Sequence, residues 1–536
     1  MSDLSDRLQG TFAAIATLRS SGLIGLERPD RAIKAAGALK KFGPTPAAAI
    51  AAAGVRHPDA LAVIDDRGVH TWREISDRAD ALARALAGRG VTAESGVGVM
   101  LRDQADFLVS VGAIARIGAD LVLLNTSFAA PQVEGVVERE GVSTVIYDLE
   151  FDDVVSGVEL AGSKVIAWGA ADAPGRDSID SLVATAPSAQ PPLPDSPGRT
   201  VILTSGTTGT PKGAKRGKPP SILDMASLLD KIPLKSGEVT VIAAPLFHSW
   251  GFVHLSVATA LGSTMVLRRR FNPAQVVEDI NRFDASALVV VPVMLKRILD
   301  LPEAERAVAS GTLRIIAASG SALSAELGTR AMDQYGPVLH NLYGSTEVAW
   351  ATIATPEDLL AAPGCAGRPP RGVTVKLVDE EGIEVAEGER GRIFVGNEML
   401  FEGYTGGGGK EVLKGLMSTG DVGRFDEGGR LFVEGRDDDM IVSGGENVFP
   451  EEVEDCLNSH EAVKDSAVVG VPDEEFGQRL RAAVVLESGS KATAEDLTAH
   501  VKAELARYKV PREIFFLDEL PRTATGKILR RRIIEL

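Results

Sequence analysis

The sequence predicts a mixed α/β protein with a large N-terminal domain of α/β subdomains and a small α+β domain at the C-terminal end. The chain has 536 residues, 44% of them hydrophobic and 24% charged, which suits two or more domains with a large core. Strand-like apolar runs alternate with helical spacings from about residue 45 onward. After about Asp438 the pattern is that of a compact α+β unit. We therefore expect three parts, at 1–44, 45–437 and 438–536.

The first part is distinguished by its charge. Residues 7–43 hold seven basic and two acidic residues with apolar residues between them, whereas the whole chain has a formal net charge of −17. A basic amphipathic helix can lie on a membrane surface. The alternative, which we prefer, is a helix that caps the main domain. The acidic balance of the whole chain argues against a general nucleic-acid binder.

Apolar residues at helical spacing predict helices over 71–90 and 106–119, with a short strand at 97–101 between them. Five prolines within 187–198 predict a semi-rigid connector. Later strands alternate with helices, which favours a parallel sheet, and they are expected at 201–203, 239–244, 287–291 and 313–318.

The C-terminal part begins a different pattern. Pro450 suits the first position of a helix, and Glu451 and Glu452 suit its first turn. A second helix is expected over 494–508, before a basic tail. Strands are expected at 466–471, 481–486 and 514–517.

Several classes of protein are disfavoured. Cys365 and Cys456 cannot build a disulfide framework, and no secretory signal is visible at the N-terminus. Residues 239–267 contain no Asp, Glu, Lys or Arg, but proline, glycine, serine and histidine interrupt the run. We interpret it as a buried strand and helix rather than a membrane span. The chain is therefore expected in the cytoplasm, with peripheral membrane contact through 7–43 left open.

The strongest motif follows the strand that ends at Leu203. The string Thr204–Gly213 holds three glycines, four threonines, a serine and a lysine. Glycines let backbone N–H groups face an anion, and hydroxyl and ammonium groups donate to phosphate oxygens. It is not a Walker loop, because GxxxxGK[ST] is not matched. On composition alone a plain turn is the alternative. The predicted phosphate-binding residues are Thr204, Ser205, Gly206, Thr207, Thr208, Gly209 and Lys212.

This string resembles the phosphate loop of the adenylate-forming superfamily, which includes acyl-CoA synthetases, luciferases and the adenylation domains of peptide synthetases. Six further segments resemble the family's motifs in the same order, over about residues 45–536. They are Pro245–Gly251, Ser319–Leu323, Asn341–Glu347, Ser418–Asp421, Gly435–Val448 and Pro521–Lys527.

The resemblance implies a ligase of the fatty-acyl-CoA synthetase type. A carboxylate attacks the α-phosphorus of ATP, pyrophosphate leaves, and coenzyme A then displaces AMP. Both reactants of the first step are anionic, so alignment and charge stabilisation dominate. The implied partners are a small carboxylic acid, ATP, Mg²⁺ and coenzyme A, with no nucleic acid and no oligomeric state specified.

The same resemblance assigns the catalytic side. Glu347 is the expected magnesium ligand, since Mg²⁺ prefers carboxylate and phosphate oxygens, and Thr346 is expected at the α-phosphate. Lys527 is expected to bridge the acyl carboxylate and the phosphate. His248 lies in the segment beside the acid pocket and is expected to act as a gate with Trp250. A hydrogen-bonded core histidine is the alternative for His248.

It also assigns the nucleotide and coenzyme A contacts. Tyr343 and Gly344 are expected beside adenine, as are Ser319, Gly320 and Ser321. Asp421 can accept hydrogen bonds from both ribose hydroxyls, with Arg436 supporting the same ribose. Asp438 is the expected hinge about which the mobile C-terminal domain rotates between the two half-reactions. Gly445 is expected in the tunnel for pantetheine.

Two departures from the family pattern touch none of these residues: Leu203 stands where an aromatic residue is common, and the string Thr405–Lys410 replaces a polar helix start. The acid is not expected to be an amino acid, because the pocket segment carries Phe247 and His248 without an aspartate. Phe283–Ser286 supplies an aspartate but lies after that segment.

An apolar pocket fits better than a charged one, so a medium- or long-chain fatty acid is the first expectation and an aryl acid the second. An acyl-AMP ligase that loads a carrier protein is the third. A nucleotide-binding protein without turnover is the alternative from a different class, and the presence of Lys527, Glu347 and Asp438 argues against it.

Overall fold

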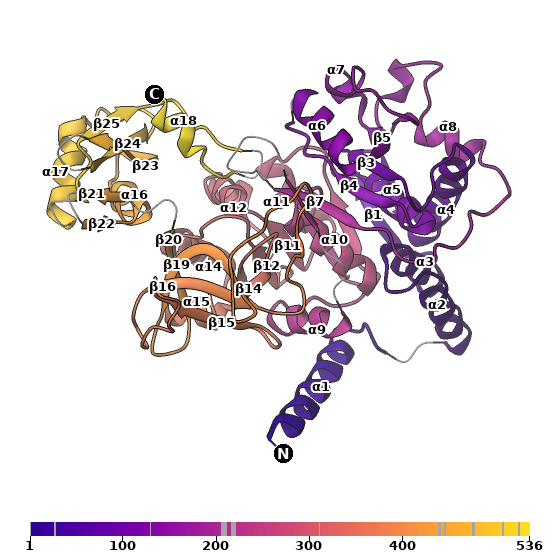
Figure 1. The fold of residues 1–536 in the computed structure, drawn as a ribbon, viewed down its shortest axis with the longest axis horizontal. Coiled ribbons are helices and arrows are strands. Elements are labelled where there is room, and N and C mark those ends of the chain that lie inside the picture. The colour runs from indigo at the N-terminus through magenta and orange to yellow at the C-terminus, as the bar shows by residue number, and fades with distance from the viewer. Residues whose placement is uncertain are drawn as a thin grey trace.

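The computed structural model confirms the predicted class: a large α/β N-terminal domain is followed by a smaller α+β C-terminal domain (Figure 1). It describes residues 2–25, 28–128, 130–204, 212–215, 221–309, 311–437, 441–443, 446–473, 477–505, 509–523 and 526–536. Several expected site residues fall outside these ranges: Ser205, Gly206, Thr207, Thr208, Gly209, Asp438 and Gly445.

The first large sheet is parallel except for its two edge strands. It is covered by helices that follow its strands, as expected for crossover connections. In spatial order it contains β14 (Ala349–Ala354), β13 (Leu339–Ser345), β12 (Ile315–Ala318), β11 (Ala287–Val290), β9 (Val239–Ile242), β10 (Thr264–Leu267), β1 (Leu61–Asp65) and β2 (Gly68–Thr71).

The second large sheet has a parallel part that ends in an antiparallel strand pair. In spatial order it contains β17 (Gly403–Tyr404), β8 (Lys212–Lys215), β7 (Thr200–Thr204), β4 (Asp120–Leu123), β3 (Gly96–Met100), β5 (Val142–Tyr147) and β6 (Lys164–Ile166). The proline-rich connector 187–198 precedes β7 and forms neither helix nor strand, as predicted.

Two smaller sheets complete the described part of the chain. One is built from β15 (Thr374–Val378), β16 (Gly391–Gly396), β18 (Val412–Leu413), β19 (Leu416–Phe425) and β20 (Leu431–Arg436). The C-terminal domain contains β21 (Ile441–Ser443), β22 (Glu446–Val448), β23 (Val463–Asp473), β24 (Gly477–Leu486) and β25 (Glu513–Phe516).

The N-terminal helices before β9 are α1 (Ser2–Ser20), α2 (Pro29–Phe42), α3 (Pro46–Arg56), α4 (Trp72–Gly88), α5 (Ala105–Ile117), α6 (Ala130–Glu140), α7 (Asp152–Val155), α8 (Ile179–Ala184) and α9 (Ile222–Lys231). The later helices are α10 (Ser249–Leu261), α11 (Pro273–Arg282), α12 (Pro292–Leu299), α13 (Glu303–Arg306), α14 (Ala325–Tyr335), α15 (Pro356–Ala361), α16 (Pro450–Asn458), α17 (Ala494–Glu504) and α18 (Arg530–Ile534).

Local sequence explains the helix boundaries. Thr71 caps α4 in a reciprocal pair with Glu74, so the helix begins one residue inside the predicted range. The predicted helix 494–508 was too long, because Leu505 adopts an extended backbone and ends α17 at Glu504. Among the described residues, no helix is long and apolar enough to cross a membrane.

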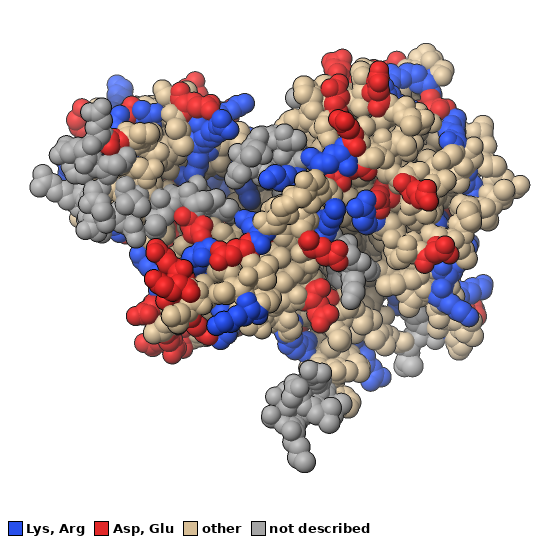
Figure 2. All heavy atoms as spheres, in the orientation of Figure 1, with Lys and Arg blue, Asp and Glu red and all other residues tan. Residues whose placement is uncertain are grey.

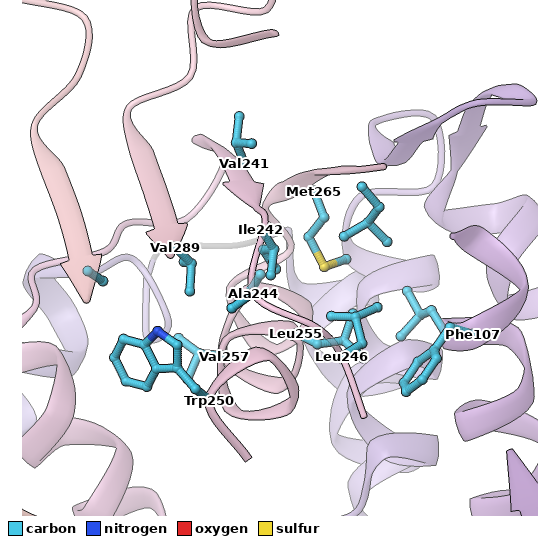
Figure 3. Packing of buried hydrophobic residues seen from close by; sticks show 14 of the residues in the cluster. Phe107, Val241, Ile242, Ala244, Leu246, Trp250, Leu255, Val257, Met265 and Val289 are labelled. Atoms are coloured by element: carbon cyan, nitrogen blue, oxygen red, sulfur yellow. The ribbon is translucent and has the colours of Figure 1, made fainter. Parts of the chain in front are cut away.

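The main core lies around the first sheet. Figure 3 shows side chains from β9, β11, α10 and α5 meeting there, among them Ile242, Val289, Trp250 and Phe107. The run without charges, 239–267, forms β9, α10 and β10, as the buried-strand interpretation predicted. On the face shown in Figure 2, acidic and basic side chains are intermixed over the described surface.

Candidate active site

The predicted phosphate loop begins and ends on paired strands. Thr204, the last residue of β7, pairs with Lys212, the first residue of β8. The ammonium group of Lys212 lies 5.4 Å from the ring centroid of Tyr404, which is a cation–π distance. β8 therefore fixes the lysine at one end of the motif, beside a tyrosine to which the sequence assigned no role.

Tyr404 also contacts the expected magnesium ligand. Its hydroxyl donates to Oε1 of Glu347 over 2.8 Å, and Glu347 is only 8% exposed. Phe401 packs edge-on against the Tyr404 ring, with centroids 4.8 Å apart. A buried carboxylate needs such a donor, because desolvation without a partner is costly. Tyr404 thus holds Glu347 and Lys212 in one arrangement.

The turn that carries Glu347 is tightly built. A Cβ on Gly344 would lie 2.0 Å from the carbonyl oxygen of Ala349, so a larger residue cannot replace it without backbone movement. Ala349 itself has a positive φ of 59°. Thr346 is half-buried within this turn, next to Glu347. The turn therefore holds the predicted α-phosphate and magnesium residues side by side.

The residues expected at the nucleoside meet across two sheets. The hydroxyl of Tyr343 donates to Oδ2 of Asp421 over 2.5 Å, which brings the predicted adenine and ribose contacts together. Asp421 on β19 pairs with Arg436 on β20, so the backbone register places the arginine directly opposite. Ser319 and Gly320 follow β12, and Gly320 has a φ of +95° that favours glycine.

Asn341, to which the motifs assigned no separate role, lies on β13 two residues before Tyr343. It lies on β13 opposite Ala318 of β12 and is 7% exposed. Its Oδ1 is buried and has no hydrogen-bond partner among the described residues. An unpaired buried acceptor is costly, so a donor such as the amino group of adenine fits this position.

The acid side begins at His248, the residue that precedes α10. Burial, and then the nearby charge of Lys527, lowers the pKa of His248 to about 4, so its ring is neutral near pH 7. Its Nε2 is buried without a partner in the described structure. His248 and Lys527 are therefore close in space, although one belongs to each domain.

Trp250 is fixed beside them. It is 7% exposed, and its indole N–H donates to the carbonyl oxygen of Val290 at the end of β11 over 3.1 Å. The hydrogen bond fixes the ring, and the gating role expected for Trp250 stays a prediction.

A buried carboxyl group that the sequence did not indicate supports this segment. Asp103 is 8% exposed, and its Oδ1 accepts the backbone N–H of Leu246 over 3.0 Å. Burial, with a smaller effect of Asp148, raises the pKa of Asp103 to about 8 against the opposing charge of Arg102. Asp103 thereby fixes the turn two residues before His248.

The C-terminal domain docks on α12 (Figure 1). A Cβ on Gly526, which has a φ of +83°, would lie 2.5 Å from Cγ1 of Val293. Lys296 of α12 also donates to the carbonyl oxygen of Lys464, over 3.1 Å. This close contact places the loop that carries Lys527 against α12 and near His248.

A metal site built by the protein alone is absent from the described residues, since none of them form a group of three or more His, Cys, Asp or Glu side chains suited to a metal. Glu347 alone suits Mg²⁺, which is typically held by one or two carboxylates together with substrate phosphates. The side chains of Thr204 and Arg436 are not described, and seven expected residues lie outside the described ranges. Their assignments stay predictions.

Comparisons with known proteins match both large parts of the chain. The model of the AMP-binding enzymes matches residues 50–405, and that of the AMP-binding enzyme C-terminal domain matches 452–527. A feruloyl-CoA synthase of Amycolatopsis sp is 32% identical over 480 residues, covering 88% of this chain and 95% of that protein.

Two further similarities bear on the acid and the acceptor. A fatty acid–[acyl-carrier-protein] ligase of Streptomyces coeruleorubidus is 30% identical over 495 residues, covering 89% of this chain and 93% of that protein. The solved structure of an anthranilate CoA ligase in complex with anthranoyl-AMP has a TM-score of 0.82 and 26% identity. The match covers 92% of this chain and 97% of the chain in the solved structure.

The Tyr404–Glu347 hydrogen bond generates the first prediction. Tyr404→Phe removes the donor and leaves a buried carboxylate less well held, so we expect the affinity for Mg²⁺–ATP to fall about tenfold, the loss of a hydrogen bond to a charged group. Titration calorimetry with Mg²⁺–ATP, and with ATP in EDTA, measures this, and the loss should be smaller in EDTA. Tyr335→Phe removes a remote hydroxyl that donates to Arg306 and serves as the control. Equal affinities for Tyr404→Phe and the control contradict the prediction.

The Val293–Gly526 contact generates the second prediction. Gly526→Ala should slow acyl-AMP formation, because its Cβ strikes Val293, yet spare conversion of supplied acyl-AMP to the thioester. Gly489→Ala is the matched control, since Gly489 has a similar φ of +86° but open space around it.

Val293→Ala should partly rescue Gly526→Ala in the same assay of the two half-reactions.

Lys527→Ala should lower the rate of acyl-AMP formation by about a hundred- to a thousandfold, the usual effect of removing one preorganised contact. If Gly526→Ala or Lys527→Ala slows acyl-AMP formation and thioester formation equally, docking of the C-terminal domain on α12 is not specific to the first half-reaction.

Proposed function

The chain belongs to the family of AMP-binding enzymes, and from this we propose that it activates an apolar carboxylic acid as its acyl-AMP and transfers the acyl group to coenzyme A. It is an AMP-forming acid–thiol ligase whose co-substrates are ATP and coenzyme A, with Mg²⁺ as the family's metal. The observation that carries the proposal is the proximity of Lys527, from the C-terminal domain, to His248, the residue that precedes α10.

The chain's own residues divide the first half-reaction between them. Tyr343, Asp421 and Asn341 orient the nucleoside, and Lys212 faces the phosphate side. Magnesium held at Glu347 would supply positive charge to the phosphate oxygens. Lys527 stabilises negative charge as the carboxylate attacks the α-phosphorus and pyrophosphate leaves.

The neutral ring of His248 borders the incoming carboxylate without adding charge. Lys527 supplies the positive charge on this side, and it does so only while the C-terminal domain is docked on α12. The second half-reaction, in which the thiol of coenzyme A displaces AMP, requires this lysine to withdraw about a hinge at Asp438. Gly445 would then border the pantetheine arm.

Two classes of carboxylic acid are candidates for the substrate. A medium- or long-chain fatty acid is supported by the apolar composition of α10 and α12, and one relative is named for a fatty acid and a carrier protein. An aryl acid is the second candidate, supported by the anchored ring of Trp250 at the acid site and by relatives named for feruloyl and anthranilate substrates.

A panel assay tests the proposed function. ATP–pyrophosphate exchange with fatty acids, cinnamates and benzoates should be positive for at least one acid, and added coenzyme A should then yield the thioester. Exchange followed by transfer only to a carrier protein would favour the acyl-AMP ligase. ATP binding without exchange for any acid would overturn the proposed function in favour of a nucleotide-binding protein.

Contact with a membrane surface is a further part of the proposal. Leu18 of α1 is buried against the core, which supports the capping interpretation for that helix. No residue of α2 is buried; its Ile33 is 72% exposed and its Leu39 is 54% exposed. Lys34 and Lys40 are exposed on the same helix. An apolar and basic surface of this kind suits an anionic bilayer.

Charge reversal tests that contact. Lys34→Glu combined with Lys40→Glu should weaken sedimentation with vesicles of anionic lipid at low salt, because each basic residue near such a surface contributes about 1 kcal/mol. Lys491→Glu with Lys502→Glu makes the same change in charge on exposed positions of the C-terminal domain and should leave binding unchanged. If the wild-type protein does not sediment with these vesicles, capping is the role of the whole segment.

A further inference from the structure

The string Thr405–Lys410, one of the two departures from the family pattern, begins with a buried residue. Thr405 is 6% exposed and directly follows Tyr404, the tyrosine that contacts Glu347. Its backbone N–H donates to the carbonyl oxygen of Gly213 in β8 over 2.8 Å. Thr405 therefore ties the segment after β17 to the strand that carries Lys212.

The hydroxyl of Thr405 connects β8 to a third element, α6. It accepts the backbone N–H of Gly213 over 3.1 Å and donates to Oε1 of Glu140, the last residue of α6. The side chain of Glu140 is 1% exposed, and Nε of Arg139 donates to the same oxygen over 2.8 Å. A hydroxyl that donates to one group and accepts from another fixes both at once. We call Glu140, Thr405 and Gly213 the Thr405 bridge.

The Thr405 bridge is closely packed at Gly213. A Cβ on Gly213 would lie 2.6 Å from Oγ1 of Thr405, 2.7 Å from Cγ1 of Val201 and 2.9 Å from Oε1 of Glu140. No side chain fits there unless its surroundings move. A change in Thr405 or Glu140 is therefore transmitted directly to the backbone of β8.

The bridge adjoins two residues of the proposed phosphate side. Gly213 follows Lys212, whose ammonium group lies 5.4 Å from the ring centroid of Tyr404. Thr405 follows Tyr404, whose hydroxyl donates to Glu347. Successive residues of a strand face opposite sides, so Lys212 points away from the side on which Gly213 meets α6. The bridge thus fixes the backbone behind the lysine and the tyrosine.

We infer that Glu140 and Thr405 are positioning residues for the phosphate side of the site, and that they act through Lys212 and Tyr404. Their hydrogen bonds hold β8 and the segment after β17 in register, so that Lys212 and Glu347 meet one triphosphate. Glu140 and Thr405 both lie outside the seven segments that resemble the family's motifs. The inference rests on the proposed function for the identity of the nucleotide.

The test compares two nucleotides that share the nucleoside. Titration calorimetry measures the Kd of Mg²⁺–ATP and the Kd of AMP for each protein. Thr405→Val keeps the shape of the side chain but leaves the N–H of Gly213 without its acceptor and Glu140 without one donor. We expect the Kd of Mg²⁺–ATP to rise about tenfold. The Kd of AMP should change by less than about twofold, because Tyr343 and Asp421, proposed to hold the nucleoside, are unaltered.

Conservative variants and a control assign the effect to the bridge. Thr405→Ser retains the hydroxyl and should bind Mg²⁺–ATP nearly as well as the wild-type protein. Glu140→Gln keeps an acceptor and should weaken Mg²⁺–ATP less than Glu140→Leu, which has none. The matched control is Thr264→Val on β10, which removes a hydroxyl that donates to the carbonyl oxygen of Leu61 over 2.8 Å and should leave both Kd values unchanged.

Two results for Thr405→Val overturn the inference: an unchanged Kd of Mg²⁺–ATP, or equal rises in the Kd of Mg²⁺–ATP and AMP. A rise that also occurs in Thr405→Ser overturns it as well. If Thr405→Val does not fold, the two Glu140 variants decide, and equal affinities of Glu140→Gln and Glu140→Leu for Mg²⁺–ATP overturn the inference.

ATP–pyrophosphate exchange tests the proposed function separately. If no acid supports exchange but the expected Kd values are found, the proposed function fails and the positioning roles stand. If the wild-type protein binds no Mg²⁺–ATP, both are overturned.

Discussion

The hydrogen bond from Tyr404 to Glu347 joins the two large sheets, and the proposed phosphate side depends on it. Glu347 follows β13 of the first sheet, and Tyr404 belongs to β17 of the second. The same tyrosine ring faces Lys212 at the start of β8. A shift of one sheet against the other would therefore separate the carboxylate from the lysine, the two groups proposed to act on one triphosphate.

Near the expected position of the substrate carboxylate, the N-terminal domain contributes a neutral side chain and the C-terminal domain contributes the positive charge. The pKa of His248 is lowered to about 4, so the residue expected beside the substrate carboxylate has a neutral ring. Positive charge reaches this position with Lys527, from the other domain. Under the proposed mechanism, this charge stabilises two reacting anions in the first half-reaction, and its withdrawal exposes the acyl-AMP to attack by a thiol.

The sequence predicted the fold class, several of the helices and strands, and two of the residue pairs in the site, and the reasons are local. Tyr343 with Asp421 and His248 with Lys527 belong to strings that resemble known motifs, and the structure brings each pair together. Tyr404 was missed because β17 has only two residues and shows no periodicity.

The contact between Val293 and Gly526 matters for anyone who alters this protein by directed evolution. Val293 stands three residues after Val290, the anchor of Trp250, so it is a natural choice for a library aimed at new acids. Each substitution there also changes how closely the lysine loop can approach. A screen that records only final product would merge substrate selectivity with domain closure, and a variant chosen for one property would carry an unrecorded change in the other.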